Sequence, residues 1–231
     1  KVMAFDIETE EFEIGKGEIL MISIVTDKIK KVLTWKRGKE KQDFVECYMD
    51  EGAMIEAFMK YVKAEEIDFL TGYFSDGFDL QYLRARAEKN GIKLALGLDS
   101  SQPSFTRGII PTGKIEGIVH VDLFRFIDTN YSQYLQSETL GLNEVSQELL
   151  GEGKREFEFK KSHKINEEEW KDYFSYNLQD SVLTYKLFES GTNHGITSYS
   201  GGASIDANGM GIIADNPQKF LLDYPQYTGV L

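Results

Sequence analysis

Short runs of apolar and β-branched residues alternate with stretches of helical periodicity along the first part of the chain. The apolar runs have the length of strands and lie at residues 2–7, 18–25, 31–35 and 68–73. Two longer stretches carry apolar side chains at the spacing of a helix, at residues 51–67 and 78–91. We therefore predict three strands in a meander, followed by a helix, a strand and a second helix.

The next part of the chain predicts a hairpin and three more helices. Apolar residues alternate around a turn-rich centre between residues 104 and 122, which predicts a β-hairpin that leads into another strand. Helical patterns follow at residues 123–129, 138–150 and 167–189. Strands and helices in this order predict a mixed α/β layered domain.

The composition changes after residue 189. Residues 190–231 contain seven glycines and too little periodic apolar surface to build a core of their own. We expect a main domain over residues 1–189 and a glycine-rich tail over residues 190–231, to which the sequence assigns no role. Every candidate site residue precedes the tail, so we expect the tail to be dispensable for catalysis.

Composition narrows the class of protein. The 231 residues are 41% hydrophobic and 28% charged, which is typical of one globular domain with appendages. No run approaches the roughly 20 apolar residues of a membrane span, so we expect no membrane partner. A lone cysteine, Cys47, excludes an internal disulfide and a cysteine-cluster zinc site. The net charge of −12 argues against a basic nucleic-acid surface, although bound cations invert the local charge of a carboxylate site.

Two acids stand near the end of the first predicted strand. Asp6 and Glu8 are two residues apart, so strand alternation points both to one face while Phe5 and Ile7 face the other. Two like charges about 4 Å apart repel by about 4 kcal/mol at an effective dielectric near 20, and a bound cation removes that repulsion. Taken alone, the pair is more often typical of surface charges at a strand end.

Two further acids lie at helix positions. Asp79 follows a glycine-containing turn at the start of a predicted helix, where capping of the helix is the ordinary alternative. Tyr176 and Asp180 stand at i and i+4 in the last predicted helix, so they share one face about a turn apart. The ordinary alternative for this pair is a surface contact, and neither motif decides the function by itself.

The order of these motifs within one α/β domain resembles the three exonuclease motifs of the DEDDy group. The chain looks most like the proofreading exonuclease domain of archaeal-type family B DNA polymerases, over about residues 2–189. The resemblance extends beyond the acids to the segments Phe5-Asp-Ile-Glu-Thr9, Ile19-Leu-Met-Ile-Ser23, Gly72-Tyr73, Phe78-Asp79, Tyr82-Leu83, His120-x-Asp-Leu123, Thr139-Leu140 and Glu144-Val145.

This resemblance implies an RNase H-like fold, with a mixed sheet of about five strands flanked by helices and an inserted β-hairpin. It also implies two divalent cations, Mg²⁺ or Mn²⁺, because oxygen ligands suit these ions better than zinc. Asp6 would bridge both ions, Glu8 and Asp180 would complete one site, and Asp79 would hold the second ion. Tyr176 would orient the attacking water. The implied reaction is 3′ to 5′ hydrolysis of terminal phosphodiesters in single-stranded or frayed DNA.

Two positions depart from the pattern of that family. Its second motif usually has one asparagine after the tyrosine and another directly before Phe-Asp, whereas this chain has Phe74 and Gly77. The missing amides put substrate positioning and rate in doubt, but not metal binding. Phe74 is a candidate substrate-binding residue that would stack on a terminal base, and burial under the loop is its alternative. His120 is expected to be a structural residue of its strand.

Three functions are compatible with these residues. The first is the proofreading module of a family B DNA polymerase, with single-stranded or primer-terminus DNA and the rest of the polymerase as partners, in the cytoplasm with the nucleoid. The second is a stand-alone DEDD exonuclease acting on RNA or short oligonucleotides. The third is an inactivated DNA-binding scaffold, which the missing asparagines favour and the intact acids disfavour. Because no Asp-Thr-Asp-Ser type motif occurs, we expect no polymerase site in this chain.

Overall fold

A computed structural model describes residues 1–36, 38, 41–108, 111–137, 139–153 and 165–191, together with 204–205 and 212–213. The chain divides into two compact units, Lys1–Leu187 and Phe188–Leu231. In the second unit, strands β9 (Ser204–Ile205) and β10 (Ile212–Ile213) pair antiparallel. Most of the expected glycine-rich tail lies outside the described residues, so its boundary and its dispensability stay predictions.

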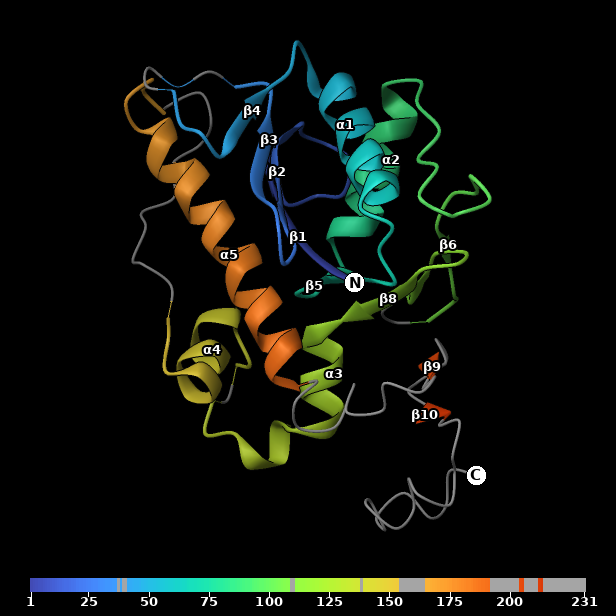
Figure 1. Cartoon of the computed structure of the whole chain (residues 1–231), viewed down its shortest axis with the longest axis vertical. Coiled ribbons are helices and arrows are strands. Elements are labelled where there is room, and N and C mark those ends of the chain that lie inside the picture. The colour runs from blue at the N-terminus through green and yellow to red at the C-terminus, as the bar shows by residue number, and fades with distance from the viewer. Residues whose placement is uncertain are drawn as a thin grey trace. The chain divides into compact units, whose positions relative to one another are not determined.

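A six-stranded mixed sheet forms the centre of the first unit (Figure 1). Its strands lie in the order β4-β3-β2-β1-β5-β8. In chain order they are β1 (Val2–Thr9), β2 (Ile19–Val25), β3 (Lys30–Thr34), β4 (Val45–Cys47), β5 (Phe69–Gly72) and β8 (Val119–Asp122). β1, β2 and β3 pair antiparallel, whereas β5 joins β1, β8 joins β5 and β4 joins β3 in parallel. The predicted meander and the mixed α/β fold are confirmed.

Helices cover both faces of this sheet (Figure 1). α1 (Glu51–Ala64) and α2 (Asp79–Lys89) pack on one face, and α5 (Trp170–Gly191), as far as Leu187, crosses the other. The shorter elements are α3 (Leu123–Asn130), the 3₁₀ turn η1 (Ser132–Tyr134) and α4 (Leu142–Leu150). The result is the layered arrangement of helices on a sheet that the order of elements predicted.

Strand alternation gives each face of the sheet its own core. On β1, Met3, Phe5 and Ile7 pack into the core beneath α1 and α2. The opposite face packs against α5 through Leu20, Met21, Val32, Trp170, Tyr173 and Phe174. Because successive side chains of a strand point to opposite faces, Asp6 and Glu8 are directed toward the α5 side. The hydrophobic pattern therefore delivers both acids to the same layer as the last helix.

Several element bounds differ from the sequence predictions. β4 was not predicted, because three residues are too few to show a periodicity and their strand pairing depends on β3, which makes a sheet of six strands rather than about five. α4 begins at Leu142 rather than at residue 138, since Leu140 adopts a positive φ of 52° and Gly141 is the N-cap. α5 begins at Trp170 rather than at residue 167.

The predicted hairpin is present as a small separate sheet. β6 (Ser104–Phe105) and β7 (Gly113–Lys114) pair antiparallel, and the chain then enters β8 of the main sheet. Residues 109 and 110, between the two strands, lie outside the described residues. Backbone contacts of β7 bring the hairpin against the loop that follows β5, where Gly113 N–H donates to the carboxylate of Asp76 at 2.6 Å.

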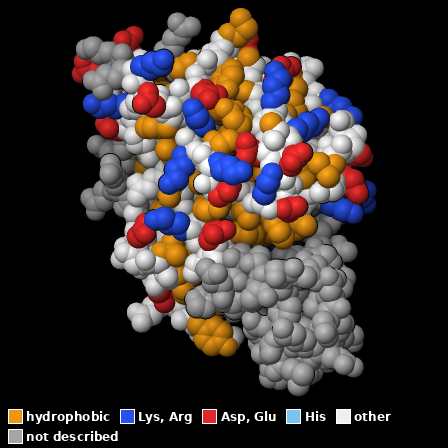
Figure 2. Space-filling model, viewed as in Figure 1, with side chains coloured by type: hydrophobic (Ala, Val, Ile, Leu, Met, Phe, Trp, Pro, Cys, Tyr) orange, Lys and Arg blue, Asp and Glu red, His pale blue; other side chains and the backbone are white. Residues whose placement is uncertain are grey.

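The surface over α1 and α2 carries mixed charges. Among the side chains that Figure 2 colours by type, Lys and Arg are interspersed with Asp and Glu. They are not gathered into one basic patch on this face. This face therefore lacks the electrostatic footprint by which many proteins hold a phosphate backbone. Within the described ranges, no helix is long and apolar enough to cross a bilayer.

A buried ion pair joins α1, α2 and β2. Glu51, at the start of α1, is 3% exposed, and its carboxylate accepts from Arg86 Nε at 2.8 Å and Nη2 at 2.6 Å. The same carboxylate accepts from Asn90 Nδ2 and from the backbone N–H of Ile19, both at 2.7 Å. A buried charge is tolerated when its hydrogen-bonding capacity is satisfied in this way. One side chain thus connects two helices to the strand that lies beside β1.

We predict that Arg86→Met lowers the free energy of unfolding by about 3 kcal/mol, because the Glu51 carboxylate would stay buried without its cation. Lys60→Met, at an exposed position of α1, is the matched control and should change that free energy by less than about 0.5 kcal/mol. Urea unfolding followed by circular dichroism measures both. Similar losses in the two variants would contradict a stabilising role specific to the buried pair.

Candidate metal centre

Small polar side chains allow α5 to lie close to the sheet at the acid pair. Ser23 of β2 is opposite Asp6 in the antiparallel register. The Oγ of Ser23 donates to the backbone carbonyl of Asn177 at 2.8 Å and lies 2.6 Å from the Oγ of Ser181. Ser23, Asn177 and Ser181 have no exposed surface. Because serine is small, the helix backbone approaches the strand directly, one turn away from Asp180.

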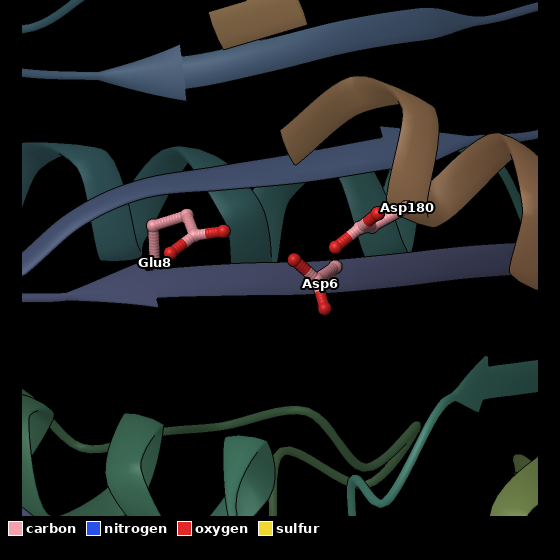
Figure 3. A group of neighbouring side chains, drawn as sticks. All are labelled: Asp6, Glu8 and Asp180. Atoms are coloured by element: carbon pink, nitrogen blue, oxygen red, sulfur yellow. The ribbon is translucent and has the colours of Figure 1, made fainter. Parts of the chain in front are cut away.

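Three acids meet where α5 crosses β1. Figure 3 shows Asp6 and Glu8 rising from the same strand and Asp180 reaching toward them from the helix. Each carboxylate offers an oxygen that lies within 4.8 Å of those of the other two. Asp180 is 5% exposed, and Asp6 and Glu8 are partly buried. Asn177 Nδ2 donates to Asp6 Oδ2 at 2.7 Å, which fixes the orientation of that carboxylate. Three acids this close repel one another unless a cation or a proton neutralises them.

Asp79 lies beside this group at the edge of β1. The pairing of β1 with β5 ends at Ala4, and the backbone N–H of Ile7 instead donates to Asp79 Oδ1 at 3.2 Å. Asp79 is 4% exposed, and its pKa is raised to about 7: burial is the largest cause, two backbone hydrogen bonds oppose it, and the carboxylates of Asp122 and Asp180 add to it. Asp79 is therefore electrostatically coupled to the acid group without belonging to the three that lie within 4.8 Å.

Tyr176 lies on the same helix as Asp180, one turn earlier. It is partly buried, and the i to i+4 spacing places both residues on one face of α5, as the sequence predicted. The structure thus brings Asp6, Glu8 and Asp180 together, places Asp79 beside them and sets Tyr176 on the helix that supplies Asp180. The metal-binding role of the acids and the water-orienting role of Tyr176 stay predictions.

Residues 1–145 match the sequence profile of the exonuclease domain of family B DNA polymerases. This chain belongs to that family. Similar proteins include the DNA polymerases of Pyrococcus glycovorans, 36% identical over 197 residues, and Thermococcus litoralis, 35% identical over 195 residues. Each alignment covers 81% of this chain, but only 24% of the first relative and 11% of the second. The chain thus spans a quarter or less of the length of these relatives. The resemblance to family B DNA polymerase exonuclease domains that the sequence motifs indicated is confirmed.

Two buried carboxylates hold the loop between β5 and α2 of the exonuclease domain. Asp122, the N-cap of α3, accepts from the backbone N–H groups of Phe74, Asp76 and Phe124, each at 3.0 Å. Asp76 accepts from Gly113 N–H and from Arg125 Nη1, the latter at 3.1 Å. These bonds tie the loop that leads into Asp79 to β8, to α3 and to the hairpin.

His120 of the exonuclease domain belongs to the same network. Its Nε2 lies 3.0 Å from Ser75 Oγ and its Nδ1 lies 3.3 Å from Asp76 Oδ1, the order of groups in a serine-hydrolase triad. Ser75 has no exposed surface, however, and the side chain of His120 is 1% exposed. No substrate reaches a serine that is buried in this way, so the geometry supports the structural role expected for His120.

The sequence did not reveal the residues that position the acids. Asn177 holds Asp6, Ser23 and Ser181 set the helix contact, and Asp122 holds the loop before Asp79. The available signal was weak: Ser23 interrupts a strand that is otherwise apolar, and Ser181 follows Asn177 at helical spacing. A small polar residue in a buried strand indicates a close contact with another element, but not which element.

Phe74 and Gly77 of the exonuclease domain depend on each other sterically. Phe74 has a positive φ of 63°, a conformation that costs a residue other than glycine on the order of 1 to 3 kcal/mol. Its ring packs edge-on against Phe124, with ring centroids 5.4 Å apart. A Cβ on Gly77 would lie 2.3 to 2.7 Å from three atoms of the Phe74 ring. The ring therefore occupies the space that any side chain at position 77 would need.

A pocket of about 440 Å³ connects this aromatic ring with the acids. Its lining consists of Asp6, Tyr73, Phe74, Phe124, Thr139, Leu140, Gly141, Leu142 and Asp180. The lining combines two carboxylates with apolar and aromatic groups, as is common where a ligand has a charged part and an apolar part. This pocket is thus lined by three parts of the domain: the loop after β5, the loop before α4, and the acid group.

We predict that Asp79→Asn removes a pH-dependent loss of stability from the metal-free exonuclease domain. With a pKa of about 7 in the folded state and 3.8 as its ordinary value, Asp79 keeps a proton on folding that the unfolded chain has released, so stability falls as pH rises from about 4 to about 7. Asparagine keeps an oxygen for Ile7 N–H but no charge. At about pH 7.5 the variant should be more stable by on the order of 1 to 4 kcal/mol.

Thermal unfolding in EDTA between about pH 4.5 and about pH 7.5 measures this difference. Asp172→Asn, at an exposed position of α5, is the matched control and should follow the pH profile of the native domain. If Asp79→Asn showed the same pH slope as the native domain, the proton would not be held by Asp79.

Proposed function

We propose that this exonuclease domain hydrolyses the terminal phosphodiesters of single-stranded or frayed DNA from the 3′ end, as the proofreading module of a family B DNA polymerase. The observation that carries the proposal is the meeting of Asp6, Glu8 and Asp180 within 4.8 Å, in a chain of this family. DNA, the remainder of a polymerase and a cytoplasmic location with the nucleoid are parts of the same proposal, since the relatives are DNA polymerases of which this chain spans a minor part.

We infer that the acid group, together with Asp79, holds two divalent cations, Mg²⁺ or Mn²⁺. All of its donors are carboxylate oxygens, which these ions prefer, and a cation would relieve the repulsion among the three clustered acids. Asp6 would contact both ions, Glu8 and Asp180 would complete one site, and Asp79 would exchange its proton for the second ion. Once bound, the cations would supply charge stabilisation and a reactive water for in-line displacement at phosphorus.

The residues of the chain would position the reacting groups. Asn177 holds the Asp6 carboxylate in place, so the acid does not reorient when substrate arrives. Tyr176, on the helix face of Asp180, would orient the attacking water through its hydroxyl. Phe74 would contact the substrate strand in the pocket that also contains Asp6 and Asp180. No nucleophilic side chain is required by this arrangement.

We predict that Asp6→Asn reduces cleavage at least a hundredfold while the fold is retained. Asparagine keeps an oxygen that accepts from Asn177, but it removes the charge shared by the two proposed cation sites, and a hundredfold loss corresponds to about 3 kcal/mol of transition-state stabilisation. Release of label from 3′-labelled single-stranded DNA with Mg²⁺ or Mn²⁺, and with EDTA, measures the activity.

Asp27→Asn, at an exposed turn between β2 and β3, is the matched control and should retain full activity. The melting temperature of Asp6→Asn in EDTA should equal or exceed that of the native domain, because one of three repelling charges is gone. Retention of more than a few percent of activity at saturating metal would contradict the two-metal assignment.

We predict that mismatched 3′ ends are degraded faster than matched ends. A terminal phosphodiester reaches the acids only after several nucleotides are unpaired, and each stacking step costs about 1.4 kcal/mol to open. The measurement compares the same labelled strand alone, in a matched duplex and in a duplex with terminal mismatches. Equal rates on matched and mismatched ends, or products that shorten from the 5′ end, would contradict the assignment of a proofreading 3′ to 5′ exonuclease. Preference for an RNA strand of the same sequence would favour the stand-alone exonuclease instead.

A further inference from the structure

The loop after β5 presents Phe74 to the pocket in a conformation that bulky residues rarely adopt. Its φ of 63° is fixed on both sides of the residue: Phe74 N–H donates to Asp122, and Phe74 carbonyl accepts from Gly77 and Phe78 N–H, all at 3.0 Å. The residue nevertheless keeps 38% of its surface exposed. A bulky residue in the left-handed region persists only where its surroundings enforce it, and such residues gather at ligand sites.

The ring of Phe74 is supported from two sides. Gly77 lies beneath it with no room for a Cβ, and the ring of Phe124 meets it at an interplanar angle of 86°. Phe124 lines the same pocket, and Tyr73 packs on Phe124 in turn, with ring centroids 6.0 Å apart. We call Phe74 and Phe124, supported by Gly77, the aromatic shelf. Its supports leave the remaining surface of Phe74 facing the pocket.

The pocket has the size of one nucleotide and suitable chemistry at each part of its lining. Its volume of about 440 Å³ is within the range that holds a single ligand of this size. Asp6 and Asp180 line it, and these are the acids at which the phosphodiester would react. The two rings of the aromatic shelf are nearly perpendicular, and Phe74 is the ring whose exposed surface is available to a base.

We propose that the aromatic shelf stacks the base of the 3′-terminal nucleotide and so positions its phosphodiester at the acid group. This inference rests on the proposed function, and it makes Phe74 a substrate-binding residue that acts by a stacking contact. Because every base has a π-face, the contact accepts all four bases. It is also insensitive to ionic strength, unlike a contact between a cationic side chain and a phosphate.

The test compares Phe74→Leu and Phe74→Trp on single-stranded DNA with a normal or an abasic 3′-terminal nucleotide. Leucine is apolar and carries the same positive-φ strain, but it has no face for stacking. On the normal end, Phe74→Leu should raise KM about tenfold with a smaller change in kcat, equally at low and high salt, and Phe74→Trp should restore KM. On the abasic end, the native domain and Phe74→Leu should agree within about twofold, because no base is present to stack.

Gly77→Ala provides a second perturbation, in which phenylalanine is kept at position 74. Its methyl group would displace the ring, so it should raise KM on the normal end as Phe74→Leu does, and the double variant should be no worse than either single variant. Melting temperatures of all variants should stay within a few degrees of the native value. An equal loss for Phe74→Leu on the normal and abasic ends would overturn the proposal, as would no loss on either.

A binding measurement separates this inference from the proposed function. Fluorescence anisotropy of the same two oligonucleotides, with Ca²⁺ in place of Mg²⁺ or Mn²⁺, reports base contact without cleavage. If the native domain cleaved no single-stranded DNA, the proposed function would fail, whereas weaker binding of the normal end by Phe74→Leu, and unchanged binding of the abasic end, would still support the shelf. If neither Phe74→Leu nor removal of the terminal base changed the binding affinity, the proposed stacking on the aromatic shelf would be overturned.

Discussion

The contact between α5 and the β1–β2 pair is the interaction on which the site depends. Ser23 and Ser181 touch through their hydroxyl groups, so the helix lies against the strands at a point where larger side chains would hold it away. Asn177 then acts twice, accepting from Ser23 through its backbone and donating to Asp6 through its amide. Placement of Asp180 beside the strand acids therefore depends on packing of the last helix, although the residues are far apart in the sequence.

The chain contains 38 acidic residues, and their surroundings separate those that hold structure from those that form a site. Asp76 and Asp122 are buried, but backbone N–H groups and Arg125 satisfy them, and they order the loop before α2. Asp6, Glu8 and Asp180 instead converge on one another, which a fold does not need for its own stability. Asp79 stands between these cases, because backbone hydrogen bonds, one of them from Ile7 N–H, hold it while burial raises its pKa to about 7. Electrostatic strain is thus concentrated where a cation would relieve it.

Periodicity sufficed to predict the elements that bury a continuous apolar face, and the alternation around Asp6 sufficed to predict that Asp6 and Glu8 point to one face of the sheet. The short strand β4 escaped prediction because its three residues take their conformation from pairing with β3. The partners of the acids escaped it as well, since Ser23 and Asn177 meet only after the sheet and α5 have packed. The hydrophobic pattern of a segment predicts which of its faces is buried. It does not predict a long-range hydrogen-bond partner, because that partner is determined only when the elements have packed.

The two departures from the expected second motif show how a steric constraint links positions that the sequence presents as independent. In a loop with asparagine at both positions, phenylalanine at position 74 alone would drive its ring into the side chain at position 77, because even a Cβ there comes within 2.3 Å of the ring. Glycine at position 77 alone meets no such obstacle, since it only removes atoms. The ring is therefore compatible with the loop only when Gly77 is present, so Phe74 and Gly77 form one substitution in physical terms. The pattern that the chain resembles would place two amides here, whereas Phe74 gives the pocket an aromatic surface, and the acids stay where the α5 contact places them.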